Sequence, residues 1–288
     1  MYQRLKLSMN RKMLRLFLIL LSMLLCQGVY AQKPQIAVQL YSFRAQLAKD
    51  IPGTLAKVQN MGVRYVELAG TYGKSVPEFL QLLKQYGLTP IGTGADFDEL
   101  EKNPQKVVND AKTLGVRYVV CFRIPHQGNA FTIEDVTKAT DVFNKAGKLL
   151  HENGLRFCYH PHGFEFRSHG NGTLFDALAK GLNPQYVNFE MDTYWIKHPG
   201  QDPAALLQKY PDRFPLLHVK DRKIGTVGNQ NGQTDVETNV VLGTGDVGLT
   251  AIMKIAKKIG VEYAIIEDES SRSETQAPLS IAFLKANN

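Results

Sequence analysis

The sequence contains few cysteines, a single tryptophan and no hydrophobic run long enough to span a membrane. Three cysteines among 288 residues exclude a disulfide-rich scaffold. The longest apolar run, residues 16–25, is about half of the roughly twenty residues that a spanning helix needs. No Gly-x-Gly-x-x-Gly follows the first expected strand, which argues against a dinucleotide-binding fold.

Beyond residue 31, the chain also lacks a large excess of positive charge. Residues 1–31 have the features of a secretory signal peptide: five basic residues and no acidic one, then the apolar run, then small residues before Gln32. Removing them lowers the formal net charge from +7 to +2. We therefore expect an exported protein, periplasmic or extracellular, with one domain over residues 32–288. We expect no stable membrane insertion after signal cleavage and no binding of nucleic acid.

The two remaining cysteines, Cys121 and Cys158, each lie inside an apolar, strand-like run. A disulfide between them is conceivable in an oxidising compartment. Two buried thiols on neighbouring strands are the favoured interpretation, because free cysteine behaves as a small hydrophobic residue.

Short apolar runs alternate with longer amphipathic stretches along the rest of the chain. Eight runs predict strands, at residues 36–41, 64–68, 89–93, 117–122, 156–160, 187–192, 215–220 and 263–267. The stretches between them predict helices, at residues 51–61, 77–86, 104–114, 133–153, 173–180, 203–210 and 249–259. Several of these end at a glycine, which forms the left-handed C-cap without strain.

Eight repeated β-α units predict an α/β fold, a closed (β/α)8 TIM barrel with a parallel sheet covered by helices. The length of 288 residues suits one such barrel of roughly 250 residues. Residues 223–243 have no periodicity, and we expect a loop over the mouth of the barrel. The turn at residues 243–246 is expected to be structural rather than a phosphate cradle.

Ionisable residues end the last four expected strands. Because the active sites of these barrels lie at the C-terminal ends of the strands, such groups should converge there. Imidazoles with several carboxylates suit one divalent metal ion, Mn2+, Co2+, Zn2+ or Mg2+. The groups are His160, His162 and Glu165, then Glu190 and Asp192, then His218 and Lys220, and finally Glu267, Asp268 and Glu269.

The order of these motifs resembles the sugar isomerase/epimerase superfamily with xylose-isomerase-like barrels. The resemblance rests on the runs at residues 38–44, 159–166, 192–195, 217–221 and 265–268. It implies that Asp192, His218 and Glu267 are metal ligands, with a fourth ligand from strand five. Relatives that isomerise free ketoses carry a glutamate where this chain has His160. Either His160 binds the metal directly or Glu165 reaches it, and Glu165 is the favoured choice.

The expected chemistry is abstraction of a proton next to a sugar carbonyl. A metal stabilises the resulting enediolate, and a carboxylate or an imidazole moves the proton. We expect Glu165, Glu267 and His160 to take part in catalysis, with Lys220 stabilising the oxyanion. Sugar binding is expected at three further residues, namely Glu67, Trp195 and His162.

Three functions were weighed for an exported barrel of this kind. The favoured one is metal-dependent cleavage or isomerisation of an unphosphorylated keto-sugar or glycoside, as in relatives that cleave 3-keto-glycosides, because sugar phosphates are scarce outside the cytoplasm. The alternatives are an aldose–ketose isomerase or epimerase on a free sugar, and a non-catalytic sugar-binding barrel. An abasic-site endonuclease is excluded by the missing Asp-x-x-His motif, since residues 192–195 end in Trp195.

Overall fold

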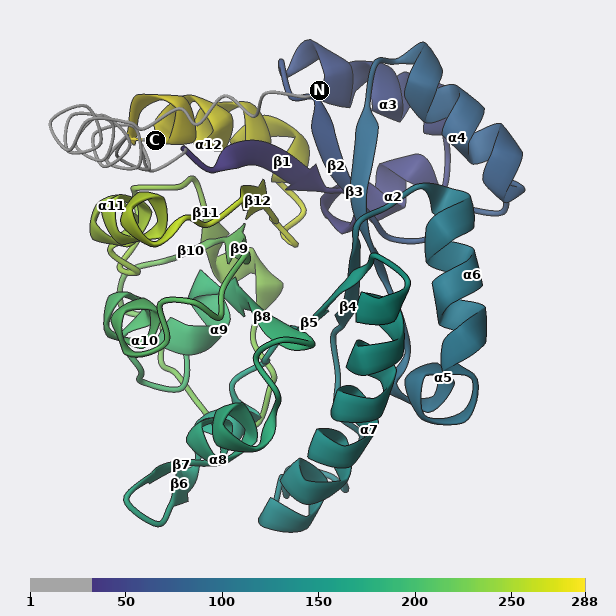
Figure 1. Ribbon diagram of the computed structural model, residues 1–288. Helices are drawn as coiled ribbons and strands as arrows, with labels where there is room; N and C mark the ends of the chain where they lie inside the picture. The colour runs from purple at the N-terminus through teal and green to yellow at the C-terminus, as the bar shows by residue number, and fades with distance from the viewer. Residues whose placement is uncertain (1–32, 288) are drawn as a thin grey trace, which may run out of the picture. The chain divides into compact units, whose positions relative to one another are not determined.

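The computed structural model describes residues 33–287, in which eight parallel strands close into a barrel (Figure 1). The strand order around the barrel is β1-β12-β9-β8-β5-β4-β3-β2. The strands are β1 (Gln35–Gln39), β2 (Tyr65–Leu68), β3 (Thr89–Gly94), β4 (Tyr118–Cys121), β5 (Arg156–Tyr159), β8 (Val187–Asp192), β9 (Leu216–Val219) and β12 (Tyr263–Ile266). The predicted (β/α)8 barrel and all eight of its strands are confirmed.

Helices surround the barrel on its outer side (Figure 1). They are α2 (Arg44–Leu47), α3 (Ile51–Asn60), α4 (Val76–Gln85), α5 (Phe97–Lys102), α6 (Pro104–Leu114), α7 (Ile133–Glu152), α8 (Leu174–Gly181), α9 (Thr193–Lys197), α10 (Pro203–Lys209), α11 (Leu249–Ile259) and α12 (Ser273–Asn287). Among the described residues, no helix is both long and apolar enough to cross a membrane. The predicted signal peptide, residues 1–31, lies outside the described residues.

Local sequence signals account for many of the helix boundaries. Proline occupies the first turn of four helices, α3, α4, α6 and α10, where its missing N–H costs nothing. Gly115 ends α6 and Gly260 ends α11 with φ of 67° and 79°, a conformation that other residues adopt only with strain. Sequence periodicity misses α12, because serine, glutamine and alanine make up much of its buried face.

Alternation along the strands separates an inner from an outer face of the barrel. In β8, Val187, Phe189 and Met191 pack in the large hydrophobic core between the sheet and the helices. Asn188, Glu190 and Asp192 alternate with them and face inward. A smaller cluster fills the lower barrel: Ala37, Ile91, Tyr118, Val120, Cys158, Leu216 and Ile265. The inner positions above this apolar cluster are therefore the polar ones.

The two cysteines lie on neighbouring strands, Cys121 on β4 and Cys158 on β5. Both thiols are free and buried, and burial raises the pKa of each above its usual value. The interpretation as buried small hydrophobic residues is confirmed.

Short elements complete the loops at the C-terminal ends of the strands. They are the 3-10 helices η1 (Leu40–Phe43), η2 (Phe164–Phe166) and η3 (Val236–Thr238), and the hairpins β6–β7 (Ser168–His169, Gly172–Thr173) and β10–β11 (Asp221–Arg222, Asn239–Val240). The long loop after β9 is irregular between residues 223 and 235, as expected. The Asp221 carboxylate accepts the N–H groups of Gly243 and Gly245 at 2.8 and 2.9 Å, so the turn at residues 243–246 is structural.

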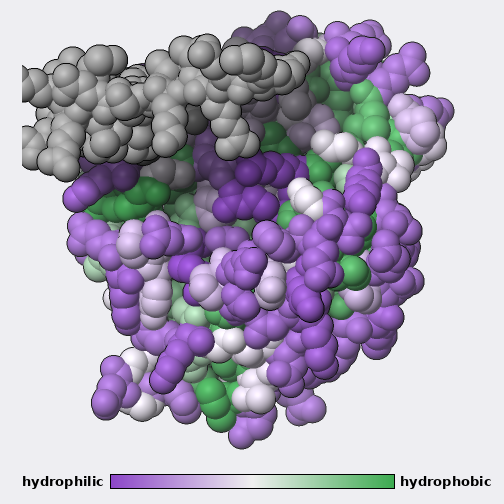
Figure 2. All heavy atoms as spheres, viewed as in Figure 1, coloured by the Kyte–Doolittle hydropathy of each residue, from purple (hydrophilic) through white to green (hydrophobic). Residues whose placement is uncertain are grey.

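The face in Figure 2 is mostly covered by hydrophilic side chains, with hydrophobic ones in small, separate patches. Such a surface is ordinary for a folded domain with an interior core.

Candidate active site

Imidazoles and carboxylates from five strands meet inside the C-terminal end of the barrel. The strand register brings them together, because Asp192 pairs with His218 and His218 pairs with Ile265, which is two residues before Glu267. The group consists of Glu67, His160, Glu190, Asp192, His218 and Glu267, all of which are buried. So many ionisable groups away from water need mutual compensation or a bound cation.

His218 lies at the centre of this cluster, with a carboxylate on each side of its ring. Its Nε2 is 2.6 Å from Glu67 Oε2 and 3.2 Å from Glu190 Oε2, while its Nδ1 is 3.1 Å from Glu267 Oε2. Gln39 donates to the same oxygen of Glu67 at 2.8 Å. Glu67 therefore holds the Nε2 side of the ring, and the Nδ1 side faces Glu267.

His160 is oriented in the same manner by a different carboxylate. Its Nδ1 lies 2.9 Å from Glu190 Oε2, and its Nε2 lies 3.6 Å from Asp192 Oδ2. Glu190 therefore holds the Nδ1 side of the ring, and the Nε2 side faces Asp192. Carboxylates that fix the far nitrogen of a histidine are the usual outer shell of a protein metal site.

The donor set and its spacing fit a divalent metal ion. Ligand atoms of His160, Asp192 and His218 all lie within 4.8 Å of one another. Two ligands bound at about 2.0–2.2 Å in tetrahedral geometry are roughly 3.3–3.6 Å apart, close to the 3.6 Å from His160 to Asp192 and the 3.1 Å from His218 to Glu267. Asp192 Oδ2 is buried, accepts no hydrogen bond of good geometry within the described residues, and has Lys220 Nζ at 3.0 Å and His160 Nε2 at 3.6 Å as its charged neighbours.

Lys220 adds a fixed positive charge beside the same carboxylates. Its Nζ lies 3.0 Å from Asp192 Oδ2 and 2.6 Å from Glu269 Oε1, and it also contacts Glu267 Oε2. Burial opposes a charge on Lys220, but these three carboxylates outweigh burial and raise its pKa well above the usual value. Lys220 is therefore a permanent cation and hydrogen-bond donor, not a base.

The same charges polarise the rest of the cluster. Burial would raise the pKa of Asp192 and Glu267, but Lys220 and the histidines lower both below their usual values. Burial would lower the pKa of His218, yet the charges of Glu190, Glu267 and Glu67 raise it well above its usual value. Both Asp192 and Glu267 are thus held as carboxylates, the form that binds a cation.

Glu165 lies apart from this cluster. It accepts hydrogen bonds from Tyr159 Oη, from the N–H of Gly163 at 2.9 Å and from the N–H of His162 at 3.2 Å. Tyr159 packs in the core between the sheet and the helices, against Phe143 of α7. Burial raises the pKa of Glu165 to about 7. Glu165 is therefore a buried brace of the loop after β5, and the structure does not bring it to the other expected ligands.

Of the two expected sugar-binding residues Trp195 and His162, only His162 lines the cavity at the mouth of the barrel. The Trp195 ring packs against His162 and His198, with centroids 5.5 and 5.6 Å apart, and Trp195 is absent from the cavity wall. His162 does line the cavity and stacks near His160 at 4.7 Å. Because β5 ends at Tyr159, strand alternation no longer applies, and both histidines face the mouth of the barrel.

A cavity of about 600 Å³ opens beside the cluster. Small residues at the ends of β2 and β3 leave this space, including Gly70, Gly94 and Ala95. The wall consists of Gln39, Tyr41, Leu68, Ala69, Gly70, Thr93, Gly94, Ala95, Asp96, Phe97, Glu99, Cys121, Phe122, Arg123, His160, His162, Glu267 and Glu269. Its volume lies within the roughly 300–1,000 Å³ of small-molecule sites.

Two contributors to this cavity escape sequence reasoning. The Phe122 ring packs beside those of His160 and His218, with centroids 5.2 and 6.2 Å away. Glu269 is expected near the strand ends without a role of its own, and the structure places it in the cavity wall. The signal that could have found both is their position, one to three residues beyond a strand end.

Comparison with known proteins agrees with this architecture. Residues 55–287 match the family described as xylose isomerase-like TIM barrel, and the chain belongs to this family of sugar-processing enzymes. Part of the chain, 95 residues, is 34% identical to inosose dehydratase 1 of Bacillus cereus and spans only 30% of that protein. A longer match, 25% identical over 258 residues, covers 74% of this chain and 80% of the inosose dehydratase of Geobacillus kaustophilus.

Solved structures share the fold at lower sequence identity. A sugar phosphate isomerase/epimerase from Parabacteroides distasonis superposes with a TM-score of 0.74 at 23% identity, covering 88% of this chain and 94% of that one. The IolI protein with a binding zinc atom superposes with a TM-score of 0.67 at 16% identity, covering 88% and 96%. These likenesses establish the shared barrel.

Proposed function

We propose that this chain is an exported, metal-dependent enzyme that abstracts a proton next to the carbonyl of an unphosphorylated sugar, and that it cleaves or isomerises a keto-sugar or glycoside. The observation that carries the proposal is that buried carboxylates orient the rings of His160 and His218. The other nitrogen of each ring then lies beside a second carboxylate, Asp192 or Glu267. The predicted signal peptide supports the choice of an unphosphorylated substrate.

The residues that would hold the metal are His160, Asp192, His218 and Glu267. His160 replaces Glu165 as the favoured fourth ligand, because Glu165 already accepts three hydrogen bonds away from the cluster. The donor set of two nitrogens and two oxygens suits Zn2+, Mn2+ or Co2+ better than Mg2+. When bound, such an ion would stabilise negative charge on the substrate oxygen.

The chain's own groups then divide the work of proton transfer. Lys220 carries a fixed charge beside the ligand carboxylates and can donate to an oxygen that gains negative charge. Glu269 lines the cavity, and Lys220 holds only its Oε1, so its other oxygen is available to accept a proton. Burial lowers the pKa of His162 to about 3, so this ring is neutral and suits hydrogen bonding to sugar hydroxyls.

In the cleavage reaction, Glu269 takes the proton from the carbon between the ketone and the anomeric carbon. The electron pair of that C–H bond first becomes the enolate and then forms a carbon–carbon double bond as the bond to the aglycone oxygen breaks. The proton finally passes to the departing oxygen. Atoms and charge balance without an oxidant or a reductant.

The test uses the protein from residue 32 onward with a chromogenic 3-keto-glucoside, before and after EDTA treatment and metal replacement. We expect release of the aglycone that EDTA abolishes and metal restores, with one metal per chain by elemental analysis. His218→Ala should lose both, and Glu269→Gln should lose activity while it keeps the metal.

Two results would overturn the cleavage reaction. Metal-dependent exchange of solvent deuterium into a free ketose, without aglycone release, would identify an isomerase or epimerase. If the protein catalyses neither deuterium exchange nor aglycone release, and Glu269→Gln still binds sugar, the protein is a non-catalytic sugar-binding barrel.

A further inference from the structure

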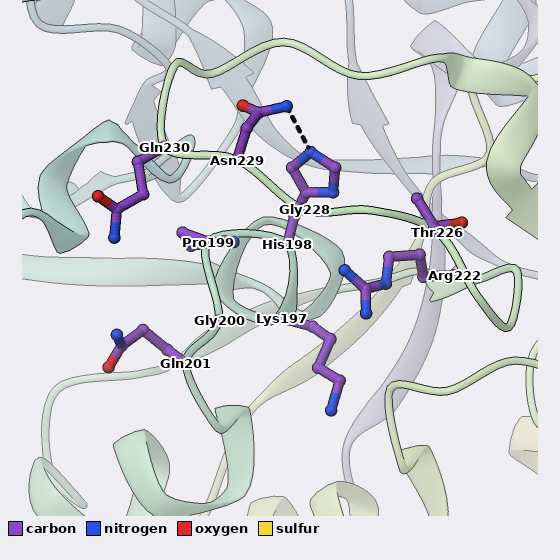
Figure 3. Close-up of a pocket in the computed structure, with 10 residues that line it drawn as sticks. All are labelled: Lys197, His198, Pro199, Gly200, Gln201, Arg222, Thr226, Gly228, Asn229 and Gln230. Carbon is purple, nitrogen blue, oxygen red and sulfur yellow. Dashed lines mark hydrogen bonds between the residues drawn. The ribbon is translucent and has the colours of Figure 1, made fainter.

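A second cavity lies beside the barrel mouth, between the end of α9 and the loop after β10 (Figure 3). It measures about 470 Å³. It shares no lining residue with the larger cavity. Its wall consists of Lys197, His198, Pro199, Gly200, Gln201, Arg222, Thr226, Gly228, Asn229 and Gln230. Three of these residues are basic and none is acidic.

Lys197 supplies the net charge of this cavity. No ion pair or hydrogen bond within the described residues involves its side chain. Arg222 donates from Nε and Nη2 to the carboxylate of Asp246 at 2.9 and 2.8 Å, which offsets its charge but leaves Nη1 as a free donor. Figure 3 shows the side chains of Lys197 and Arg222 on one side of the cavity and those of Gln201 and Gln230 on the other.

His198 contributes a buried donor that has no acceptor in the described part of the chain. Asn229 Oδ1 accepts from Asn231 N–H at 3.0 Å, and Asn229 Nδ2 donates to the Gln233 carbonyl at 2.9 Å, which fixes the amide. The Nδ2 group, 3.0 Å from His198 Nε2, therefore donates to that nitrogen, and the ring proton belongs on Nδ1. His198 is 3% exposed, and Nδ1 has no partner.

The helix end does not oppose an anion here. The carbonyls of Ile196 and Lys197 accept the N–H groups of Gln201 and Gly200, so these two acceptors of the last turn of α9 are occupied. Gly228 passes so close to the His198 carbonyl that a Cβ would lie 1.8 Å from it. The loop can therefore close the cavity at this point only with a glycine.

We propose that this cavity binds an oxyanion group, a sulfate or a carboxylate, carried by a sugar. Lys197 supplies the charge, and Arg222 Nη1 and His198 Nδ1 supply donors. The amides of Gln201, Asn229 and Gln230 suit the neighbouring hydroxyl groups, because the volume far exceeds that of a bare ion. The site is independent of the proposed reaction, since no metal-site residue lines it.

The site also has a built-in reporter. Trp195 is the only tryptophan of the chain, and its ring centroid lies 5.6 Å from that of His198. A ligand that contacts His198 should therefore change the tryptophan fluorescence. A sugar at His162, 5.5 Å from the same ring, would change it too, so Lys197→Met assigns the signal to this cavity.

The experiment titrates the protein from residue 32 onward with glucose 6-sulfate, glucuronate, inorganic sulfate and glucose at constant ionic strength. Binding is followed by Trp195 fluorescence and by calorimetry. We expect the two acidic sugars to bind more tightly than either glucose or inorganic sulfate. Lys197→Met should weaken their binding about tenfold, the effect of losing one charge-assisted hydrogen bond, with aglycone release unchanged.

The matched control is Lys223→Met, which removes an exposed charge from the same loop outside the cavity wall. Equal weakening in both variants would assign the binding to general surface charge and overturn the site. Equal affinity for inorganic sulfate and glucose 6-sulfate would overturn the assignment to a sugar. Binding of glucose as tight as that of the acidic sugars would overturn the oxyanion itself.

Discussion

The two halves of the barrel mouth differ in what their strand ends carry. The ends of β5, β8, β9 and β12 carry His160, Asp192, Lys220 and Glu267, and neighbouring charged atoms of this group lie 2.5 to 3.6 Å apart. The ends of β2 and β3 carry small residues, and the cavity lies over them. One half therefore concentrates charge and the other provides space.

This division separates two requirements of sugar chemistry. A charged cluster must be rigid, because a shift of about 1 Å in a ligand or a donor costs binding and rate. A sugar needs room and hydroxyl-binding groups rather than charge. Changes to the charged groups should therefore alter metal content and rate, and changes to the small residues that line the open half should alter substrate affinity alone.

The largest expected effect comes from Asp192→Asn. The Oδ1 atom of Asp192 accepts the N–H groups of Tyr194 and Trp195 at 2.8 and 3.0 Å, and asparagine can keep this cap. Only the charge next to His160 and Lys220 is lost. We expect the metal content to fall to near zero and the rate to fall at least about 10³-fold, since a bound metal contributes several kcal/mol.

Elemental analysis and turnover of the 3-keto-glucoside measure this result, and a melting temperature equal to that of the EDTA-treated wild type is the control for folding. Full metal content with normal turnover would show that Asp192 is only a helix cap.

Glu165→Gln tests the boundary of the charged half. The pKa of Glu165 is raised to about 7 in the folded state by burial, and it is about 4.3 when unfolded. Between these values the folded state holds a proton that the unfolded state releases, so the wild type loses about 3 kcal/mol of stability as pH rises from 4 to 8.

Glutamine removes this dependence. Urea unfolding at pH 5 and pH 8 measures the free energy of unfolding. The stability of the variant relative to the wild type should be greater at pH 8 than at pH 5, with metal content unchanged. The exposed Glu152 of α7 provides the control substitution Glu152→Gln. Loss of metal in Glu165→Gln would return Glu165 to the ligand set.

The contrast between the halves also explains how far the sequence could be read. Ionisable residues at strand ends are visible as a pattern, so Asp192, His218 and Glu267 could be found from strand periodicity and from the resemblance. The direction of Glu165 could not be predicted, because β5 ends at Tyr159 and Glu165 lies in the turn beyond it, where its carboxylate accepts from Tyr159 Oη. The alternation of side chains between the two faces of a sheet does not continue beyond the last residue of the strand.

Space is harder to read than charge. The cavity depends on residues that lack side chains, such as Gly70 and Gly94, and the same glycines could equally mark turns. The orienting roles of Glu67 and Glu190 depend on strands that are neighbours only after the barrel closes. Such contacts have no local signature in the sequence.

Glu67→Gln should sharpen the comparison with a smaller effect. Glu67 comes from the open half, yet its carboxylate holds His218 Nε2 at 2.6 Å. Glutamine can still accept that hydrogen bond but loses the charge that makes the imidazole a better ligand. We expect metal affinity to fall about 10- to 100-fold, measured by competition with a chelator. Gln39 also donates to Glu67, and the variant Gln39→Glu adds a carboxylate beside it where Glu67→Gln removes one. Equal metal affinities of the wild type and both variants would contradict the orienting role of Glu67.

The smallest expected effect is that of Gly94→Val, which fills space in the open half. A Cβ at residue 94 would lie 3.2 Å from Cε2 of the Phe122 ring, so the larger side chain must displace that ring into the cavity. Valine suits the extended backbone at the end of β3, and the barrel should remain folded. We expect KM to rise about tenfold, the cost of one misplaced apolar contact of 1–2 kcal/mol, with kcat and metal content within twofold of the wild type. A loss of metal in this variant would mean that Phe122 positions His160 and His218, and that the two halves are not independent.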